Sequence, residues 1–213
     1  SRTLLAVALP SALGPVLSNG SIALATAYVG TFGSVALAAY GIAARLEYIL
    51  VPVTFGIGSA LTAMVATNLG ASQPARAKRV TWTGAAVVSA VTGAIGVAAA
   101  LWPAAWMALF TNDPAVHAAG SEYLRIVGGC YGFFGVGLVL FFASQGAGRL
   151  GWALGASAAR LLVVAIGGWF TVHVVAGPPA ALYAIIALSL VALAGVVAVA
   201  TYAADWAVAG AGP

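Results

Sequence analysis

Long stretches without a charged residue constrain this chain more than any other feature of its sequence. Charged side chains make up only 6% of the residues, whereas apolar side chains make up 63%. About 20 apolar residues in a helix cross the ~30 Å hydrocarbon layer of a bilayer. The long uncharged runs all exceed that length, and they cover residues 3–44, 48–75, 80–112, 126–148 and 161–204. The sequence therefore predicts an integral membrane protein.

The continuity of the apolar runs favours helices over a β-barrel. Strands of a membrane barrel alternate apolar and polar residues in segments of about ten. Here the stretches 85–102 and 183–200 are apolar almost throughout. A helix pairs its own backbone groups, as lipid requires, and the 27 glycines of the chain suit close packing of helices. The predicted fold class is all-α.

Turn-forming residues divide the chain into six predicted transmembrane helices, which together form one domain over residues 1–213. Asp113 is a predicted N-cap, and Pro52 is predicted to kink the second span. The expected spans are 3–28, 35–68, 79–104, 115–143, 151–173 and 180–205.

Basic residues are distributed unevenly between the two ends of these spans. If the spans alternate in direction, one end carries Arg2, Arg76, Lys78, Arg79 and Arg149. The loops at the other end contain no Lys or Arg. Because Lys and Arg accumulate in cytoplasmic loops, we expect both chain ends and the loop 70–79 to face the cytoplasm, in a cytoplasmic (inner) membrane. No arginine-rich helix or aromatic-studded basic patch indicates nucleic-acid binding.

Four stretches resemble, in order and at matching spacing, the MATE (multidrug and toxin extrusion) transporters. In 41–80, a small-residue run and the turn "NLGA" precede a basic loop, as in the second helix of a MATE lobe. The stretch 109–128 is similar to the family's outer turn. The stretch 141–163 resembles its next cytoplasmic turn, and 9–20 its proline-containing seventh helix. The chain is similar to the C-terminal six-helix lobe alone, without the N-terminal lobe of the pseudo-twofold pair.

The resemblance implies half of a secondary active exporter. In this family cationic or amphipathic compounds are exchanged for H⁺ or Na⁺, and alternating access comes from rocking of two lobes. The implied partners are membrane lipid, small lipophilic or cationic substrates, and a second lobe that is either covalent or a half-size subunit. The alternatives are a non-transporting assembly or lipid-binding subunit, and an exporter of a lipid-linked precursor.

The same resemblance implies where the coupling ion binds. Many MATE proteins carry a coupling carboxylate in the seventh or the tenth helix. The matching stretches of this chain, 14–20 and 128–137, contain no Asp or Glu. The H⁺ or Na⁺ site is therefore expected in the missing lobe, and no other cofactor is expected.

Ionisable residues within the spans are the first candidates for a site, because such groups normally face a cavity or a partner. Arg160 lies near the middle of its span, where it lines a substrate or gating cavity, bonds helix-terminal carbonyls, or snorkels towards the inner surface. Glu122 and Arg125 share a helix face and are expected to form an ion pair. Arg45 and Glu47 point to different faces near the outer boundary, where Glu47 either titrates or meets lipid headgroups.

Uncharged polar residues form a second set of candidates. Asn19, Ser18, Tyr131 and Gln145 are expected either to line a cavity for a lipophilic cation or to form hydrogen bonds between helices. In the first case Tyr131 supplies a cation–π face.

Enzymatic function is not indicated by the sequence. The single cysteine, Cys130, lies inside a span, which excludes a disulfide framework or a cysteine metal site. The two histidines have no carboxylate cluster nearby at ligand spacing, and no pair of aspartates lies within the spans. We therefore predict no catalytic and no metal-binding residues.

Overall fold

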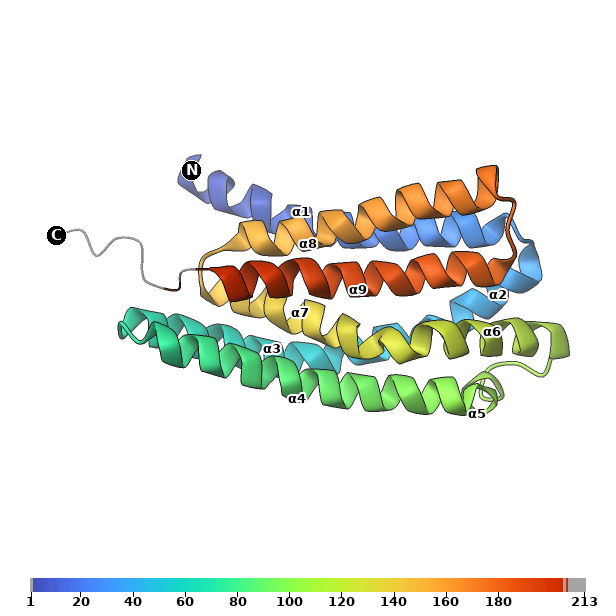
Figure 1. Ribbon diagram of the computed structural model, residues 1–213, viewed down its shortest axis with the longest axis horizontal. Helices are drawn as coiled ribbons and strands as arrows, with labels where there is room; N and C mark the ends of the chain where they lie inside the picture. The colour runs from blue at the N-terminus through green and yellow to red at the C-terminus, as the bar shows by residue number, and fades with distance from the viewer. Residues whose placement is uncertain (1, 205, 207–213) are drawn as a thin grey trace.

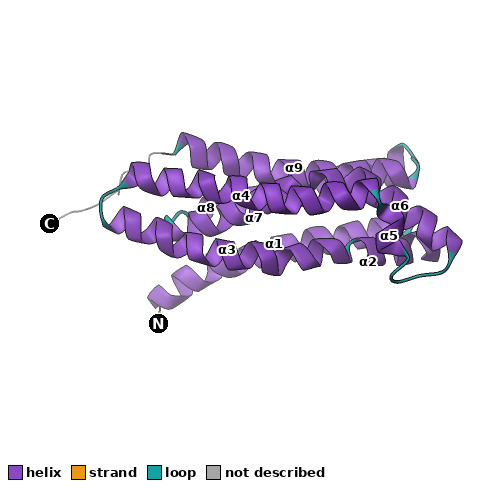
Figure 2. Cartoon of the chain, turned by 90° about the horizontal axis from the view of Figure 1, so that it is seen from below, coloured by secondary structure: helices purple, strands orange, loops and turns teal. Residues whose placement is uncertain are grey.

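The computed structural model shows an elongated bundle of helices (Figures 1 and 2). It describes residues 2–204 and 206, with side chains from Leu13 onward, and this part contains no strand. The α-helices are α1 (Arg2–Gly30), α2 (Ser34–Ala43), α3 (Arg45–Gly70), α4 (Pro74–Leu101), α5 (Pro103–Met107), α6 (Pro114–Val127), α7 (Tyr131–Gly146), α8 (Leu150–Leu162) and α9 (Pro179–Ala203). A 3₁₀ turn, Gly128–Cys130, joins α6 to α7, and the π-helical segments Val163–Gly167 and Phe170–Val174 follow α8.

The helices confirm an all-α membrane fold. Within the described residues, 5 helical segments are long and apolar enough to cross a membrane, and each lies at a predicted span. These segments are Ser34–Gly70, Pro74–Leu101, Pro114–Gly146, Leu150–Val174 and Pro179–Ala203. Helix α1 covers the predicted span 3–28, but the side chains before Leu13 lie outside the described part, so this sixth span stays a prediction. Asp205, at the end of the last predicted span, also lies outside it.

Local sequence explains where several helices begin. The carboxylate of Asp113 accepts hydrogen bonds from the backbone N–H groups of Ala115, at 2.8 Å, and Val116, at 3.3 Å, which confirms the predicted N-cap. Proline opens α4, α5, α6 and α9, at the position where its missing N–H costs nothing. The second span is interrupted at Ala44, whereas Pro52, where the sequence predicts a kink, lies inside α3.

Helix α7 lies at the centre of the bundle. It packs against α3, α4 and α9, while α9 also packs against α8, and α8 against α1. Three tyrosines connect α2, α6 and α9 through edge-to-face ring contacts. The ring centre of Tyr123 on α6 lies 5.4 Å from that of Tyr40 on α2 and 5.2 Å from that of Tyr183 on α9. Such contacts add to the apolar area that these rings bury.

The basic residues gather at one end of the bundle. In Figure 1 the α3–α4 and α7–α8 turns lie at the left end, where α1 begins and α9 ends, and the α1–α2, α5–α6 and α8–α9 connections lie at the right end. Arg76, Lys78 and Arg79 lie in the first two turns of α4, and Arg149 immediately precedes α8, so these four residues share an end, as alternating spans require. The side chain of Arg2 is outside the described part. Lys78 also has a structural contact, because its Nζ donates to the carbonyl of Tyr202 at 3.0 Å.

Reversing the charge of this loop is expected to disturb the orientation of the protein. The triple change Arg76→Glu, Lys78→Glu and Arg79→Glu removes the positive bias from which the cytoplasmic position of the loop is predicted. A Gln73→Cys reporter in a Cys130→Ala background, labelled with a membrane-impermeant maleimide in intact cells, should then react in part of the population. A control with only Arg76→Glu and Arg79→Glu keeps the Lys78 contact and should give an intermediate result. Labelling that the triple change leaves unaltered would contradict the predicted orientation.

Candidate functional site

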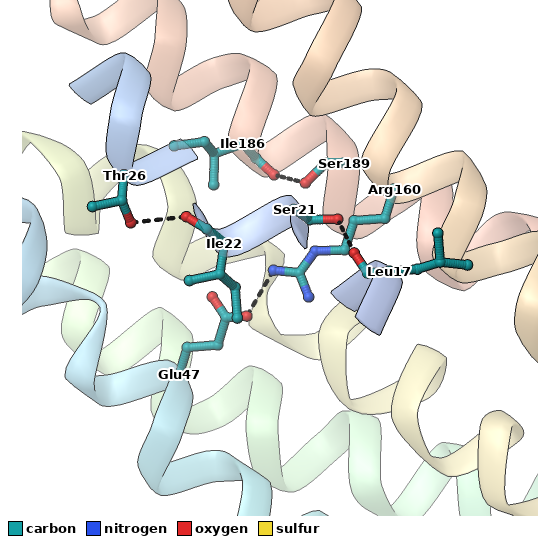
Figure 3. Close-up of polar contacts among 8 residues, drawn as sticks. All are labelled: Leu17, Ser21, Ile22, Thr26, Glu47, Arg160, Ile186 and Ser189. Atoms are coloured by element: carbon teal, nitrogen blue, oxygen red, sulfur yellow. Dashed lines mark hydrogen bonds and ion pairs between the residues drawn. The ribbon is translucent and has the colours of Figure 1, made fainter. Parts of the chain in front are cut away.

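A buried ion pair joins α3 to α8 inside the bundle (Figure 3). Nη2 of Arg160 donates to Oε1 of Glu47 at 2.8 Å, and the two side chains are only 7% and 12% exposed. Glu47 lies in the first turn of α3, and Arg160 lies in the last turn of α8.

A cavity of about 300 Å³ adjoins this ion pair. Helices α1, α3, α7, α8 and α9 contribute to its walls. Its volume is at the lower end of the roughly 300–1,000 Å³ that small-molecule pockets occupy. Apart from the ion pair, its polar side chains are Ser18, Tyr48 and Ser157. The remaining lining is apolar or glycine, and it includes Phe134, Leu138, Phe141 and Leu193.

Arg160 has more hydrogen-bond donors than the protein satisfies. A guanidinium offers five N–H donors, yet the described structure gives it a single bond, from Nη2 to Glu47. Its Nε is buried and has no partner. The nearby hydroxyls of Ser21 and Ser189 donate to the carbonyls of Leu17 and Ile186, and neither oxygen accepts a hydrogen bond from Arg160 in the described structure (Figure 3). Unsatisfied buried donors are costly, and this Nε has no accessible surface, so the cavity itself does not satisfy it.

The structure agrees in part with the charged positions chosen from sequence. Arg160 lines a cavity and bonds a carboxylate, not helix-terminal carbonyls. Glu47 lines that cavity as well and pairs with Arg160, which disagrees with the alternative in which it meets lipid headgroups. Its depth near the outer boundary stays a prediction. Arg45 is exposed and points elsewhere, with its guanidinium carbon 5.3 Å from the ring centre of Phe110. The ion pair predicted between Glu122 and Arg125 is not formed between these two described side chains, which are both exposed.

Three of the uncharged or aromatic candidates do not reach the cavity. Tyr131 is completely buried on the side of α7 that packs against Gly96 of α4, so its proposed cation–π role in the cavity is wrong. Gln145 is exposed near the end of α7. Asn19 is exposed, and its Nδ2 donates to the carbonyl of Pro15 at 2.9 Å. Only Ser18, from the same set, lines the cavity.

Several lining residues were not candidates from the sequence. Phe134 and Phe141 were not among the candidates, and neither were Tyr48 and Ser157. The helical spacing of Phe134, Leu138 and Phe141 places them on one face of α7, but α7 is apolar on all faces. Spacing in such a helix does not tell which face borders a cavity.

Comparison with known proteins places the fold among transporters. The MatE family model matches residues 10–170. A curated relative, the FAD transporter of Shewanella oneidensis, is 30% identical over 138 residues, which are 65% of this chain and 30% of that protein. Among solved structures, the MATE transporter ClbM in complex with Rb⁺ is similar with a TM-score of 0.83 and 19% identity, over 92% of this chain and 46% of that one.

Two further solved structures show the same fold. The MATE transporter VcmN of Vibrio cholerae has a TM-score of 0.82 and 20% identity, over 91% of this chain and 44% of that one. A MOP superfamily transporter from Pyrococcus furiosus, whose binding pocket is described as having reverse polarity, has a TM-score of 0.80 and 14% identity, over 92% of this chain and 43% of that one. The chain therefore spans less than half the length of each of these proteins.

Proposed function

The chain belongs to the MatE family of membrane transporters, and we propose that it forms one lobe of a secondary active exporter. In this proposal the substrate enters the cavity beside Arg160 and Glu47. The cargo is a cationic or amphipathic compound, exchanged for H⁺ or Na⁺ across the cytoplasmic (inner) membrane. FAD, the cargo named for the curated relative, is an amphipathic aromatic compound. The protein transports its cargo and catalyses no reaction on it.

The buried ion pair is the observation that carries this proposal. Ionisable residues at membrane depth are rare, and they mark substrate or ion pathways when they border a cavity. Here a positive and a negative side chain from two different helices meet at the wall of a ligand-sized cavity.

A second lobe is the proposed partner. The chain covers 43% to 46% of the solved MATE and MOP transporters named above, and the resemblance of its motifs is to a C-terminal lobe. We propose that the second lobe is either covalent or supplied by another half-size subunit. The Glu47 carboxylate is already balanced by Arg160, which supports placing the coupling H⁺ or Na⁺ in that second lobe.

The intact mass of the protein in its native membrane tests the arrangement of the lobes. A mass near double the 21.0 kDa of this chain is expected if both lobes are covalent. A mass near 21.0 kDa, together with a complex twice as large after mild cross-linking, is expected if two half-size subunits assemble. A species of 21.0 kDa that stays monomeric in the membrane would contradict the two-lobe proposal.

Filling the cavity is expected to abolish transport. Ser157 on α8 is buried and lines the cavity, so Ser157→Leu would occupy part of the ~300 Å³. The matched control is Thr83→Leu on α4, an exposed position outside the cavity. In proteoliposomes that contain the full-length protein, Ser157→Leu should lower ethidium export driven by a pH or Na⁺ gradient at least tenfold, and the control should not. Equal export by both variants would exclude this cavity as the substrate site.

A further inference from the structure

We propose that the start of α4 binds an anionic phospholipid, with the lipid phosphate at Arg76 and Arg79 and an acyl chain along the exposed face of the helix. The site lies at the α3–α4 turn, which extends past the ends of α7 and α9 (Figure 1). An open pocket of about 520 Å³ lies there. Its polar lining residues are Ser72, Gln73, Arg76 and Arg79. The inference concerns a bound lipid and does not depend on which cargo the protein exports.

Of the four basic residues that the structure describes at this end of the bundle, two have partners and two do not. Nζ of Lys78 donates to the carbonyl of Tyr202 at 3.0 Å and lies 4.7 Å from the centre of its ring. The guanidinium carbon of Arg149 lies 5.2 Å from the ring centre of a neighbouring tryptophan. Arg76 and Arg79 are exposed, and neither forms a hydrogen bond, an ion pair or a ring contact in the described part of the chain. Both guanidinium groups are therefore available to an anion from outside the protein.

The start of α4 is positively charged without a compensating carboxylate in the described structure. No described residue that lines the pocket is acidic. Glu47 belongs to the buried ion pair, whereas Asp113 caps α6 and Glu122 lies within it, at the other end of the bundle (Figure 1). Asp205 lies outside the described residues. The helix end adds to the positive potential, because its N-cap Gln73 makes no side-chain hydrogen bond to the first turn.

The exposed face of α4 continues from the two arginines into an apolar surface. Val87 follows Arg76 by eleven residues, and Ala90 follows Arg79 by the same spacing, which completes about three helical turns. Each pair therefore lies on one face, on which Val87 is 48% exposed and Ala90 is exposed as well. Eleven residues span about 16 Å, close to half of the ~30 Å hydrocarbon layer. An acyl chain attached to a phosphate at the arginines can thus lie against this surface.

Aromatic residues indicate that the arginines lie at the depth of lipid headgroups. Trp82, three residues after Arg79, is partly buried against the core, and Tyr202 near the end of α9 is 71% exposed. Tryptophan and tyrosine concentrate at the boundary between hydrocarbon and water. Basic groups at this boundary attract anionic lipids. This depth, together with the apolar surface of α4, favours a lipid phosphate over a soluble one.

Binding of lipids that differ in net charge tests the proposal. The full-length protein, delipidated in dodecyl maltoside, is titrated with dioleoyl phosphatidylglycerol and with dioleoyl phosphatidylcholine, and native mass spectrometry counts the bound lipid. We expect phosphatidylglycerol to bind roughly 10- to 30-fold more tightly, the factor that two basic residues near a membrane surface provide. The double variant Arg76→Gln with Arg79→Gln should lose most of this preference. A preference that survives in this variant would overturn the inference.

A matched double variant separates a specific pocket from general attraction to the basic end of the bundle. Lys78→Gln with Arg149→Gln removes the same net charge, but from side chains that have partners in the protein. It should therefore retain the preference for phosphatidylglycerol. An equal loss in both double variants would show that net charge alone attracts the lipid, and it would also overturn the inference.

A photoreactive lipid locates the acyl chain on the unmodified protein. Phosphatidylglycerol with a diazirine in one acyl chain should label α4 between Thr83 and Ala94 more strongly than photoreactive phosphatidylcholine does. Millimolar glycerol phosphate, which offers the phosphate without the chains, should not prevent this labelling. Labelling confined to other helices, or displacement of the lipid by glycerol phosphate, would reject the assignment of this site to a phospholipid.

Discussion

Replacing Arg160 by glutamine is expected to destabilise the protein by about 3–5 kcal/mol, because it leaves the Glu47 carboxylate buried without a partner. Both side chains are largely buried, with exposures of 7% and 12%. Glu47→Gln should have a smaller effect, because the guanidinium then retains the ring of Phe134 beside it. Thermal unfolding in micelles, followed by circular dichroism, measures both effects.

The double variant is the control for this prediction. With Arg160→Gln and Glu47→Gln together, two neutral amides replace the ion pair, and most of the stability should return. Such a recovery gives a coupling energy between the two positions, as a double-mutant cycle defines it. Losses that simply add would show that the two side chains act independently, contrary to the 2.8 Å contact.

Loss of the Arg160 side chain should also reduce transport. We expect Arg160→Ala to reduce efflux while the chain still inserts in the membrane, because the spans are determined by apolar length and not by this residue. Normal efflux at equal protein level would remove Arg160 from the site.

The helical fold was predictable because a bilayer imposes the length of its spans. Uncharged runs of sufficient length, bounded by turn residues, place helices with little dependence on tertiary contacts. The N-cap at Asp113 was predictable because its interactions are local: its hydrogen bonds run to residues two and three positions later. The break at Ala44 carries no comparable mark, because alanine is a good helix former.

The site was predictable only in its most unusual member. Arg160 was identified because a charge in an apolar span needs an explanation, but its partner lies 113 residues away, and sequence spacing says nothing about such a contact. The direction of the Tyr131 side chain was predicted wrongly because α7 is apolar on every face. The packing of Gly96 against Tyr131, and not the periodicity of the sequence, decides that direction. Glu122 and Arg125 have the spacing of an ion pair, yet exposed pairs gain little over solvation.

Gly96→Ala is expected to cost about 3 kcal/mol of stability, because it forces α4 away from the junction of α6 and α7. A methyl group at Gly96 would collide with the carbonyl oxygen of Gly128 and would lie 2.8 Å from Cβ of Tyr131. Backbone groups cannot rotate out of the way as a side chain does, so the whole contact must open. Overpacking of this kind typically costs 1–3 kcal/mol, and the backbone contact places this case at the upper end.

Two other glycines, one on the same helix and one on α3, provide graded controls for this effect. At Gly93, one turn earlier on α4, the added methyl group would lie 3.5 Å from Cα of Gly132, an ordinary contact. At Gly56 on α3 nothing lies within 4 Å. Thermal unfolding should therefore show a large loss for Gly96→Ala, a small one for Gly93→Ala and none for Gly56→Ala. Because α7 packs on α3, α4 and α9, a loss at Gly96 that matched the loss at Gly56 would mean that the α4–α7 contact contributes little to the bundle.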